Sequence, residues 1–550
     1  MRHRVTAAAG RPGVRRWMSR GRCRWMLGSR VQRRPNRETT VYGNECFPYC
    51  QRYRTAAKGS TMTLLLPPSI DAVTSGVRQA RAMLAWQAQR VGAGIAGHYP
   101  VRPRPLATPP PGSGLRPVLG DFGPPGIGYT LQVLADPIAF SQERVRRYGP
   151  VQWMGVLGRR AVAVASPEAL EAVYLDRAKV LSAQRGWEYL IGPFFRGGLL
   201  LRDFDEHLFH RRIMQQAFTR TRLVGYLELT TPRITAGVAG WRPSRNFHAY
   251  RAIKQLLLEQ ATEVFAGAEL GRDGARLERA FEDAVRGGQA LIRTNMPGGI
   301  WARGMRGRRV LEEHFRRELP AKRAGAGADL FSVLCRAKTE EGHTFTDEEI
   351  VQHMIFVMMA AHDTSTIATS MLIYELARHP HWQDRLRAES RALGKPALDY
   401  ADLDRLPALD MAFREVLRMY SPVGQQVRET VADTDLLGHY IPAGTLIMCG
   451  SYAMMRSDEY WRDAAVFDPE RFAAERREDK SHRFAWAAFG GGAHKCIGMY
   501  FGGMTVKAVL HQMLSRYRWS VPDGYRVPLV ATTGPTPGDG LPIRLERLSD

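Results

Sequence analysis

One decapeptide near the C-terminal end restricts the fold more than any other part of this 550-residue chain. Residues 489–498 read Phe-Gly-Gly-Gly-Ala-His-Lys-Cys-Ile-Gly, and an amphipathic helical pattern follows directly. The glycines allow positive φ angles and a close approach of the backbone to a flat partner. Backbone N–H groups at a helix start stabilise a thiolate, so Cys496 is a candidate ligand for iron. A core cysteine in a glycine-rich turn is the alternative interpretation.

Composition limits the class of protein. Hydrophobic residues make up 44% of the chain, which is enough for a large core. The six cysteines include no C-x-x-C pair, so neither a zinc module nor a disulfide scaffold is indicated. The net charge is +24, but residues 1–60 hold 15 basic and two acidic side chains, so no specific nucleic-acid partner is expected. No apolar run reaches the length of a membrane span, and we expect a soluble, cytoplasmic protein with at most a peripheral membrane contact.

The basic N-terminal segment has three open interpretations. Residues 1–60 are rich in Arg and broken by Gly and Pro. They fit a disordered basic arm, an organellar transit peptide, or a stretch outside the natural protein, with Met62 as the true start. We expect an N-terminal extension over residues 1–99, its first 60 residues disordered, and one large catalytic domain over residues 100–550.

Hydrophobic periodicity predicts a mainly α protein with a smaller β part. Residues 100–128, rich in Pro and Gly, read as an extended lead-in. Alternating apolar residues over 151–163 predict a hairpin, and Ser166-Pro-Glu168 predicts a helix start. From about 204 to 515 the pattern is mainly helical. The clearest helical stretches are 256–266, 347–379 and 409–420, and short strands are expected after residue 523.

The decapeptide resembles a known signature. The spacing F-x-x-G-x-H-x-C-x-G, filled by Phe489, Gly492, His494, Cys496 and Gly498, is similar to the haem-binding motif of the cytochrome P-450 family of haem-thiolate monooxygenases. The resemblance implies the cytochrome P-450 fold and haem b with Cys496 as axial thiolate. Such a thiolate pushes electron density toward the iron and favours O–O cleavage.

A second motif pairs Glu415 with Arg418. Three residues apart on a helical pattern, their side chains share one face; a solvated surface pair is the commoner outcome. The family resemblance implies that Arg471, in Phe-Asp-Pro-Glu-Arg-Phe over 467–472, closes an ion triad with them. A buried triad is costly unless fully paired, so we expect a structural role in holding the thiolate loop.

A third motif, Ala-Ala-His-Asp-Thr-Ser over 360–365, interrupts an apolar helical run. An acid and hydroxyls are costly there unless they are used. The resemblance implies that Thr364 and Asp363 relay protons to the oxygen site. In the alternative, Thr364 bonds back to its own helix and Asp363 is a cap or surface residue. His362 resembles, weakly, the histidine of the corresponding motif in the sterol demethylase branch of the family.

Four basic residues are candidates for binding the haem propionates. His207 and Arg211 have i,i+4 spacing on one helix face. The resemblance implies that Arg428 and His494 join them, since two buried carboxylates need cationic partners. Lys495 beside the thiolate is either simply solvated or docks an acidic electron donor.

Together these motifs imply a monooxygenase that inserts one atom of dioxygen into a hydrophobic substrate such as a sterol, terpenoid or fatty acyl chain. No flavin or iron–sulfur module appears, so electrons are expected from a ferredoxin and its reductase, or equivalent donors. Two alternatives stay open: a peroxide-using or rearranging haem enzyme of the same fold, and a non-catalytic haem sensor. Segments 189–195 and 532–534 are expected to line an apolar substrate pocket.

Overall fold

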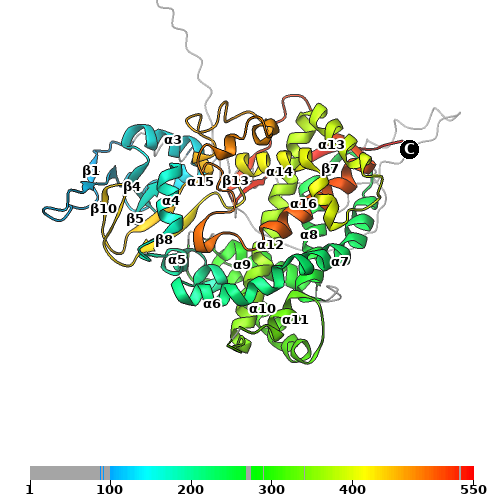
Figure 1. Ribbon diagram of the computed structural model, residues 1–550. Helices are drawn as coiled ribbons and strands as arrows, with labels where there is room; N and C mark the ends of the chain where they lie inside the picture. Colours follow the sequence, from blue (N-terminus) through cyan, green and yellow to red (C-terminus); the bar gives the residue numbers. More distant parts are fainter. Residues whose placement is uncertain are drawn as a thin grey trace, which may run out of the picture. The chain divides into compact units, whose positions relative to one another are not determined.

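The computed structural model describes residues 99–549, except 268–273, 289, 291, 340 and 532–533. It also describes three isolated positions before this range, 87, 91 and 94. The expectations for residues 1–61 and for Thr532 and Thr533 therefore lie outside the described residues. Figure 1 shows helices α7, α8, α13 and α16 gathered on one side of α12, with the strand-rich part on the other. None of the described helices is both long and apolar enough to cross a bilayer.

Helices dominate the described chain, as the periodicity predicts. They are α2 (Thr130–Ala135), α3 (Pro137–Tyr148), α4 (Pro167–Leu175), α5 (Ala183–Phe195), α6 (Phe204–Gln215), α7 (Arg220–Ala239), α8 (Ala249–Ala266), α9 (Gly274–Gly288), α10 (Ile300–Ala324), α11 (Leu330–Arg336), α12 (Asp347–Arg378), α13 (Pro380–Ala392), α14 (Pro407–Met419), α15 (Ser451–Met454) and α16 (Met499–Arg516). The helices predicted over 256–266, 347–379 and 409–420 are confirmed as α8, α12 and α14. The helix start predicted at Ser166 is also confirmed, since its side chain caps α4.

Helix α12 organises the larger core. Thr346 and Glu349 form a capping box at its start, which satisfies free N–H groups of the first turn. Nearly every residue from Ile350 to Ala377 is buried, as expected for a helix that is apolar on all sides. Helices α8, α14 and α16 pack against it and bury their own apolar faces there.

The β part is built around a seven-stranded sheet, in the order β1-β3-β4-β5-β11-β8-β6. Its strands are β1 (Arg104–Pro105), β3 (Leu119–Asp121), β4 (Val151–Val156), β5 (Arg159–Val164), β6 (Leu181–Ser182), β8 (Gln426–Thr430) and β11 (Leu446–Cys449). The predicted hairpin is confirmed, because β4 and β5 pair antiparallel with Val151 opposite Val164.

The remaining strands form three small sheets. These are β2 (Arg116–Pro117), β10 (His439–Ile441) and β9 (Thr434–Leu436); β12 (Tyr517–Ser520), β15 (Pro542–Arg547) and β7 (Ser244–His248); and β13 (Leu529–Ala531) with β14 (Pro535–Pro537). Short strands after residue 523 are therefore confirmed. The mainly helical expectation was wrong for residues 426–449, where β8 and β11 pair with strands far away in sequence.

Glu415 on α14 lies between two arginines. Its carboxylate contacts Arg418 through Nε at 2.7 Å and Nη2 at 2.8 Å, and Arg471 Nε lies 3.3 Å from Oε1. All three side chains are at most 1% exposed. The other guanidinium N–H groups donate to backbone carbonyls, including those of Met455 and Asp463. Every charge in this triad is therefore paired, which is the condition under which a buried ion cluster is tolerated.

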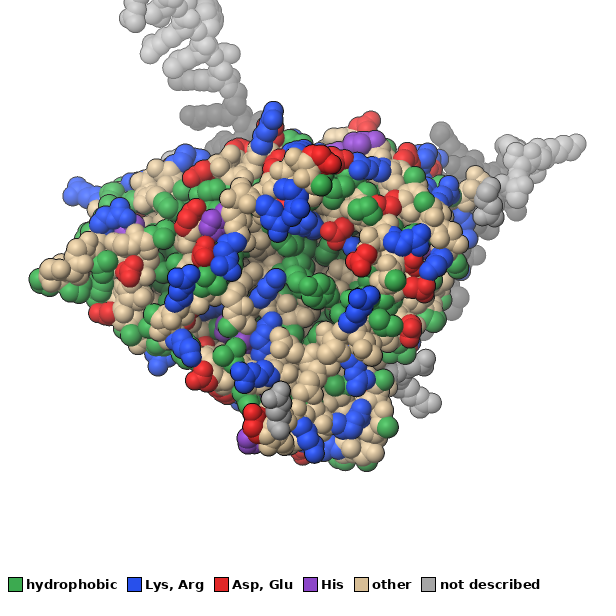
Figure 2. Space-filling view, viewed as in Figure 1, with side chains coloured by type: hydrophobic (Ala, Val, Ile, Leu, Met, Phe, Trp, Pro, Cys, Tyr) green, Lys and Arg blue, Asp and Glu red, His purple; other side chains and the backbone are tan. Residues whose placement is uncertain are grey.

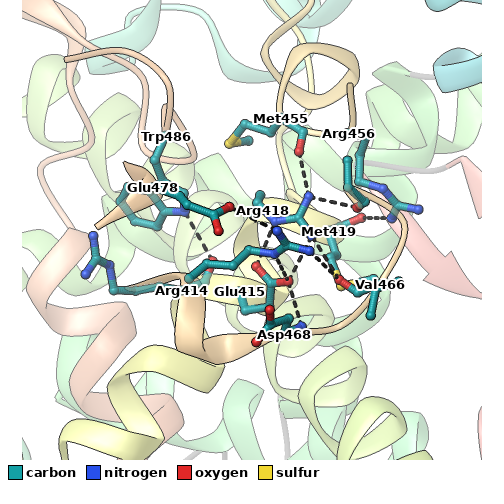
Figure 3. Close-up of polar contacts among 12 residues, drawn as sticks. Arg414, Glu415, Arg418, Met419, Met455, Arg456, Val466, Asp468, Glu478 and Trp486 are labelled. Carbon is teal, nitrogen blue, oxygen red and sulfur yellow. Dashed lines mark hydrogen bonds and ion pairs between the residues drawn. The ribbon is translucent and has the colours of Figure 1, made fainter. Parts of the chain in front are cut away.

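The triad joins α14 to the irregular segment that leads to the thiolate loop. The backbone N–H of Asp468 donates to Glu415 at 3.0 Å, and Figure 3 shows Arg418 reaching the Met455 and Val466 carbonyls. One residue before Glu415, the Arg414 carbonyl accepts a hydrogen bond from the indole of Trp486. Helix α14 thus contacts the segment 467–486 near both of its ends.

Replacing Arg418 by alanine leaves the Glu415 charge buried with half of its partners. We expect R418A to lower the free energy of unfolding by about 3–5 kcal/mol, measured by urea denaturation followed by circular dichroism. Arg385 forms an exposed Arg–Glu pair with Glu470, so the control R385A should cost no more than about 1 kcal/mol. Equal losses in the two variants would contradict a structural role for the triad.

Candidate functional site

The segment from Phe489 to Gly498 forms a loop that its own backbone closes. The N–H of Cys496 donates to the Phe489 carbonyl at 3.0 Å, and helix α16 begins one residue after Gly498. Gly492 has φ of +59°, and a Cβ built there would lie 1.7 Å from the Tyr174 carbonyl oxygen of α4. Only glycine allows this close approach, so α4 presses the loop into place. A Cβ at Gly498 would instead meet no atom within 4 Å.

The Cys496 thiol faces a space inside the fold. Cys335 and Cys449 are buried, whereas Cys496 is exposed. Burial nevertheless raises the pKa of the Cys496 thiol, which requires protein around it on most sides. The Gly498 backbone N–H and the positive charges of Arg211 and Lys495 oppose this rise. Cys496 is therefore exposed, yet protein surrounds most of its thiol. The surrounding groups stabilise the anionic form of the sulfur.

The four predicted propionate ligands lie together beside this space. The rings of His207 on α6 and His494 on the loop stack with centroids 3.8 Å apart. Arg211 follows one turn after His207, and Arg428 on β8 is 3% exposed. Burial, followed by the charges of Arg428, His207 and Arg211, lowers the pKa of His494 to about 2. Burial and the same two arginines lower the pKa of His207 to about 4. The sequence motifs therefore converge in three dimensions.

These basic groups have no acidic partner in direct contact. Among the described residues, no carboxylate forms an ion pair with Arg211 or Arg428, and the buried Nδ1 atom of His207 has no hydrogen-bond partner. Buried cations are stable only when an anion joins them. The cluster therefore fits a ligand that brings negative charge, such as the two carboxylates of a haem. On the face shown in Figure 2 the surface is hollowed near its centre, with Lys and Arg side chains around the hollow.

Helix α12 presents one face of partly exposed residues. Within the otherwise buried stretch 350–377, the residues that are not fully buried are Phe356, Met359, Ala360, Ala361, Asp363 and Thr364. Their spacing places most of them on one side over two turns, which indicates that this side lines a space. The Thr364 hydroxyl donates to the Ala360 carbonyl at 2.7 Å, so the back-bonded arrangement considered above is present.

The loop and α12 approach one another through α16. A Cβ built at Gly502 of α16 would lie 3.8 Å from the Ser365 hydroxyl, next to Thr364. On the other side, a Cβ at Gly186 of α5 would lie 2.7 Å from the Arg428 Cα atom, so α5 packs directly on β8. The site is therefore bounded by α5, α6, α12, strand β8 and the cysteine loop.

Some features of this region were not predicted. Trp187 on α5 has a buried indole N–H without a hydrogen-bond partner among the described residues, and Lys254 on α8 contacts His362. Neither has a local sequence signal, because both act through non-local packing. Of the segment expected to line the pocket, Tyr189 is exposed, whereas Phe194 and Phe195 are packed in the core.

Comparison with known proteins agrees with this site. The family model described as Cytochrome P450 matches residues 122–297 and 308–536. Cytochrome P450 136 of Mycobacterium tuberculosis is 44% identical over 447 residues, covering 80% of this chain and 90% of that protein. Abscisic acid 8'-hydroxylase 2 of Oryza sativa is 26% identical, with coverage of 73% and 81%.

A solved structure supports the same fold. The structure titled retinoic acid bound cyanobacterial CYP120A1 superposes with a TM-score of 0.71 at 24% identity, covering 78% of this chain and 98% of that one. The mainly α fold and the haem-thiolate chemistry expected from the sequence are thereby confirmed. This chain belongs to the cytochrome P450 family, whose members are monooxygenases that carry haem on a cysteine thiolate.

Proposed function

We propose that Cys496 is the axial ligand and that the chain oxidises an apolar substrate at the space between the cysteine loop and α12. Haem on a thiolate supplies the activation of dioxygen. The observation that carries the assignment is the exposure of Cys496, whereas Cys335 and Cys449 are buried. The N–H of Gly498 and the Arg211 charge favour the anionic sulfur that an iron ligand must be.

The basic cluster gives the cofactor its orientation in this proposal. Arg211 and Arg428 would bind the propionates, together with the stacked pair of His207 and His494. Binding would satisfy the buried Nδ1 atom of His207 and neutralise cations that otherwise repel one another. Phe489, Gly492 and Gly498 would shape the loop against the porphyrin plane.

Thr364 and Asp363 would handle protons on the opposite face. The Thr364 hydroxyl is held by the Ala360 carbonyl, which fixes its oxygen on the open side of α12. With its hydrogen donated to Ala360, the hydroxyl oxygen can accept a further hydrogen bond, and it would pass a proton on by releasing its own hydrogen after accepting another. Asp363 is also on the partly exposed side and is the nearest acid in sequence.

The substrate would be an apolar molecule of the terpenoid class. Phe356, Met359 and Ala360 give α12 an apolar lining. Two of the similar proteins are named for abscisic acid and retinoic acid, both of which have isoprenoid carbon skeletons. This similarity favours terpenoids over the sterols and fatty acyl chains that the sequence also allows.

Electrons would come from a separate ferredoxin and its reductase. Lys495 is exposed next to the loop that holds Cys496, and a basic residue at that position suits an acidic donor protein. The family in general receives electrons from partner proteins and uses dioxygen with hydrophobic substrates.

The Cys496 assignment is tested with the reduced carbonyl complex. We expect the wild-type protein to show the thiolate-type Soret shift and to oxidise a terpenoid when a surrogate ferredoxin, its reductase and NADPH are added. C496S should lose both the shift and the turnover, because a hydroxyl does not replace the thiolate. C335A removes a cysteine in the core and should keep both. A thiolate-type spectrum in C496S would contradict the assignment, and turnover with peroxide alone would favour the peroxide-using alternative.

The role of the basic cluster is tested by haem retention. Hydrogen bonds to charged groups contribute about 1.5–3 kcal/mol each, so R428Q should weaken haem binding by roughly tenfold or more. The measurement is the haem-to-protein ratio after gel filtration, determined as the pyridine haemochrome. The control R212Q changes the exposed neighbour of Arg211 on α6 and should retain haem. Full retention in R428Q would show that the arginine does not bind the cofactor.

A further inference from the structure

His362, next to Asp363 on α12, has an oxygen atom near each of its ring nitrogens. Its Nε2 atom lies 3.1 Å from the backbone carbonyl of Lys254 on α8. A carbonyl oxygen only accepts hydrogen bonds, so Nε2 must carry a hydrogen. Nδ1 is then the ring atom left to gain or lose a proton, and it lies 3.4 Å from Oδ1 of Asp363.

This geometry makes the two side chains a binding place for a proton. Without a proton between them, the Nδ1 lone pair faces the carboxylate, and both are poorly solvated at 8% and 17% side-chain exposure. A proton placed between them is attracted by both groups. Burial lowers the pKa of His362, and the Asp363 carboxylate opposes that shift.

Further charged groups lie near the pair and extend toward solvent. The Lys254 ammonium forms an ion pair with Glu282 on α9, and Glu282 lies 3.9 Å from Arg286. Side-chain exposure increases along this series, from 20% at Lys254 to 29% at Glu282 and 63% at Arg286. The charges of Lys254 and Glu282 act on His362 in opposite directions.

A tyrosine completes the surroundings. Burial raises the pKa of Tyr250 on α8, and the charge of Asp363 contributes to the rise. Tyr250 therefore stays a neutral phenol near the carboxylate. The titratable groups around the pair of His362 and Asp363 are thus Tyr250 and Lys254 from α8 and Glu282 from α9.

We propose that His362 is the positioning residue that returns a proton to Asp363 after Asp363 has passed one toward Thr364. In this step the Nδ1–H bond breaks and its electron pair stays on Nδ1, while a new O–H bond forms on the Asp363 carboxylate. A hydronium ion from solvent then protonates Nδ1 again, and the water molecule that it leaves returns to solvent. The inference rests on the proposed roles of Asp363 and Thr364.

The shared proton is tested without turnover. The probe is the ring ¹³C–¹H signal of histidine-labelled full-length holoprotein in the diamagnetic ferrous carbonyl state, followed from pH 5 to pH 9. The His362 signal is the one missing from H362Q. We expect D363N to shift the His362 titration to lower pH, because it removes the carboxylate that favours the charged ring. E282Q should shift it in the same direction by a smaller amount.

The matched control is His353, a fully buried histidine on the same helix that pairs with His210 at 2.9 Å. H353Q should leave the His362 titration unchanged. A His362 signal that does not titrate, or that titrates at the same pH in wild type and D363N, would overturn the inference. That outcome would leave the Cys496 assignment intact, since the carbonyl spectrum decides it separately.

A second measurement uses turnover with the surrogate ferredoxin and a terpenoid. The amide of H362Q can still donate a hydrogen bond to the Lys254 carbonyl, but it does not titrate. The variant therefore keeps the contact with Lys254 and loses the transferable proton of Nδ1. We expect turnover to fall by roughly tenfold or more and the solvent deuterium isotope effect to rise. In wild type, turnover should fall as the pH rises through the His362 titration, because the ring then carries no proton.

H362Q should lack this alkaline limb, whereas H353Q should keep the wild-type profile and isotope effect. A purely structural role for His362 would lower turnover equally at all pH values without changing the isotope effect, and that result would overturn the inference. Absence of turnover in the wild-type protein with every terpenoid and donor would instead count against the proposed function.

Discussion

Glu415 carries a charge in a fully buried part of the core, where Arg418 of the same helix and Arg471 from a later segment neutralise it. This constraint determines where the segment between α14 and the cysteine loop must run. The guanidinium groups of Arg418 and Arg471 also donate hydrogen bonds to backbone carbonyls within residues 455–466, a segment without regular secondary structure. The polar groups of this irregular segment are thereby satisfied by fixed charges, which stabilises its path.

The cysteine loop depends on that support from one side and on α4 from the other. Trp486, bonded to the Arg414 carbonyl, packs against Phe489 with ring centroids 5.7 Å apart. Gly492 meets α4 so closely that no side chain fits. The sulfur of Cys496 is thus held at a defined place by the backbone of its loop, and no side chain among the described residues donates a hydrogen bond to it.

Charge is distributed in opposite ways in the two polar centres of the molecule. In the triad, each cation has an anion within the protein. In the cluster of Arg211, Arg428, His207 and His494, no carboxylate of the described residues forms an ion pair with either arginine. The first arrangement is complete and supports the fold, whereas the second is incomplete and fits an anionic ligand. The distinction follows from the geometry and could not be read from residue types, since each centre combines an arginine on a helix with a second arginine from a distant segment.

Local sequence was sufficient for features that depend on neighbouring residues. The i,i+3 pair of Glu415 and Arg418, the helix start at Ser166, the 151–163 hairpin and the glycine-rich loop before α16 all follow from short-range spacing, and the structure contains each contact or element. The family resemblance added the fold and the cofactor. Strands β8 and β11 were missed, because each pairs with a strand at least 247 residues away along the chain.

The sequence by itself therefore determined the family, the helical class and the thiolate loop, since these depend on residue type and local spacing. Only the tertiary structure decided that Phe194 and Phe195 pack in the core, that the four basic residues lie together beside the sulfur, and that His362 stands between Asp363 and Lys254. These relations join elements that are far apart along the chain. Burial strengthens the electrostatic interactions in these relations, and no single sequence position encodes it.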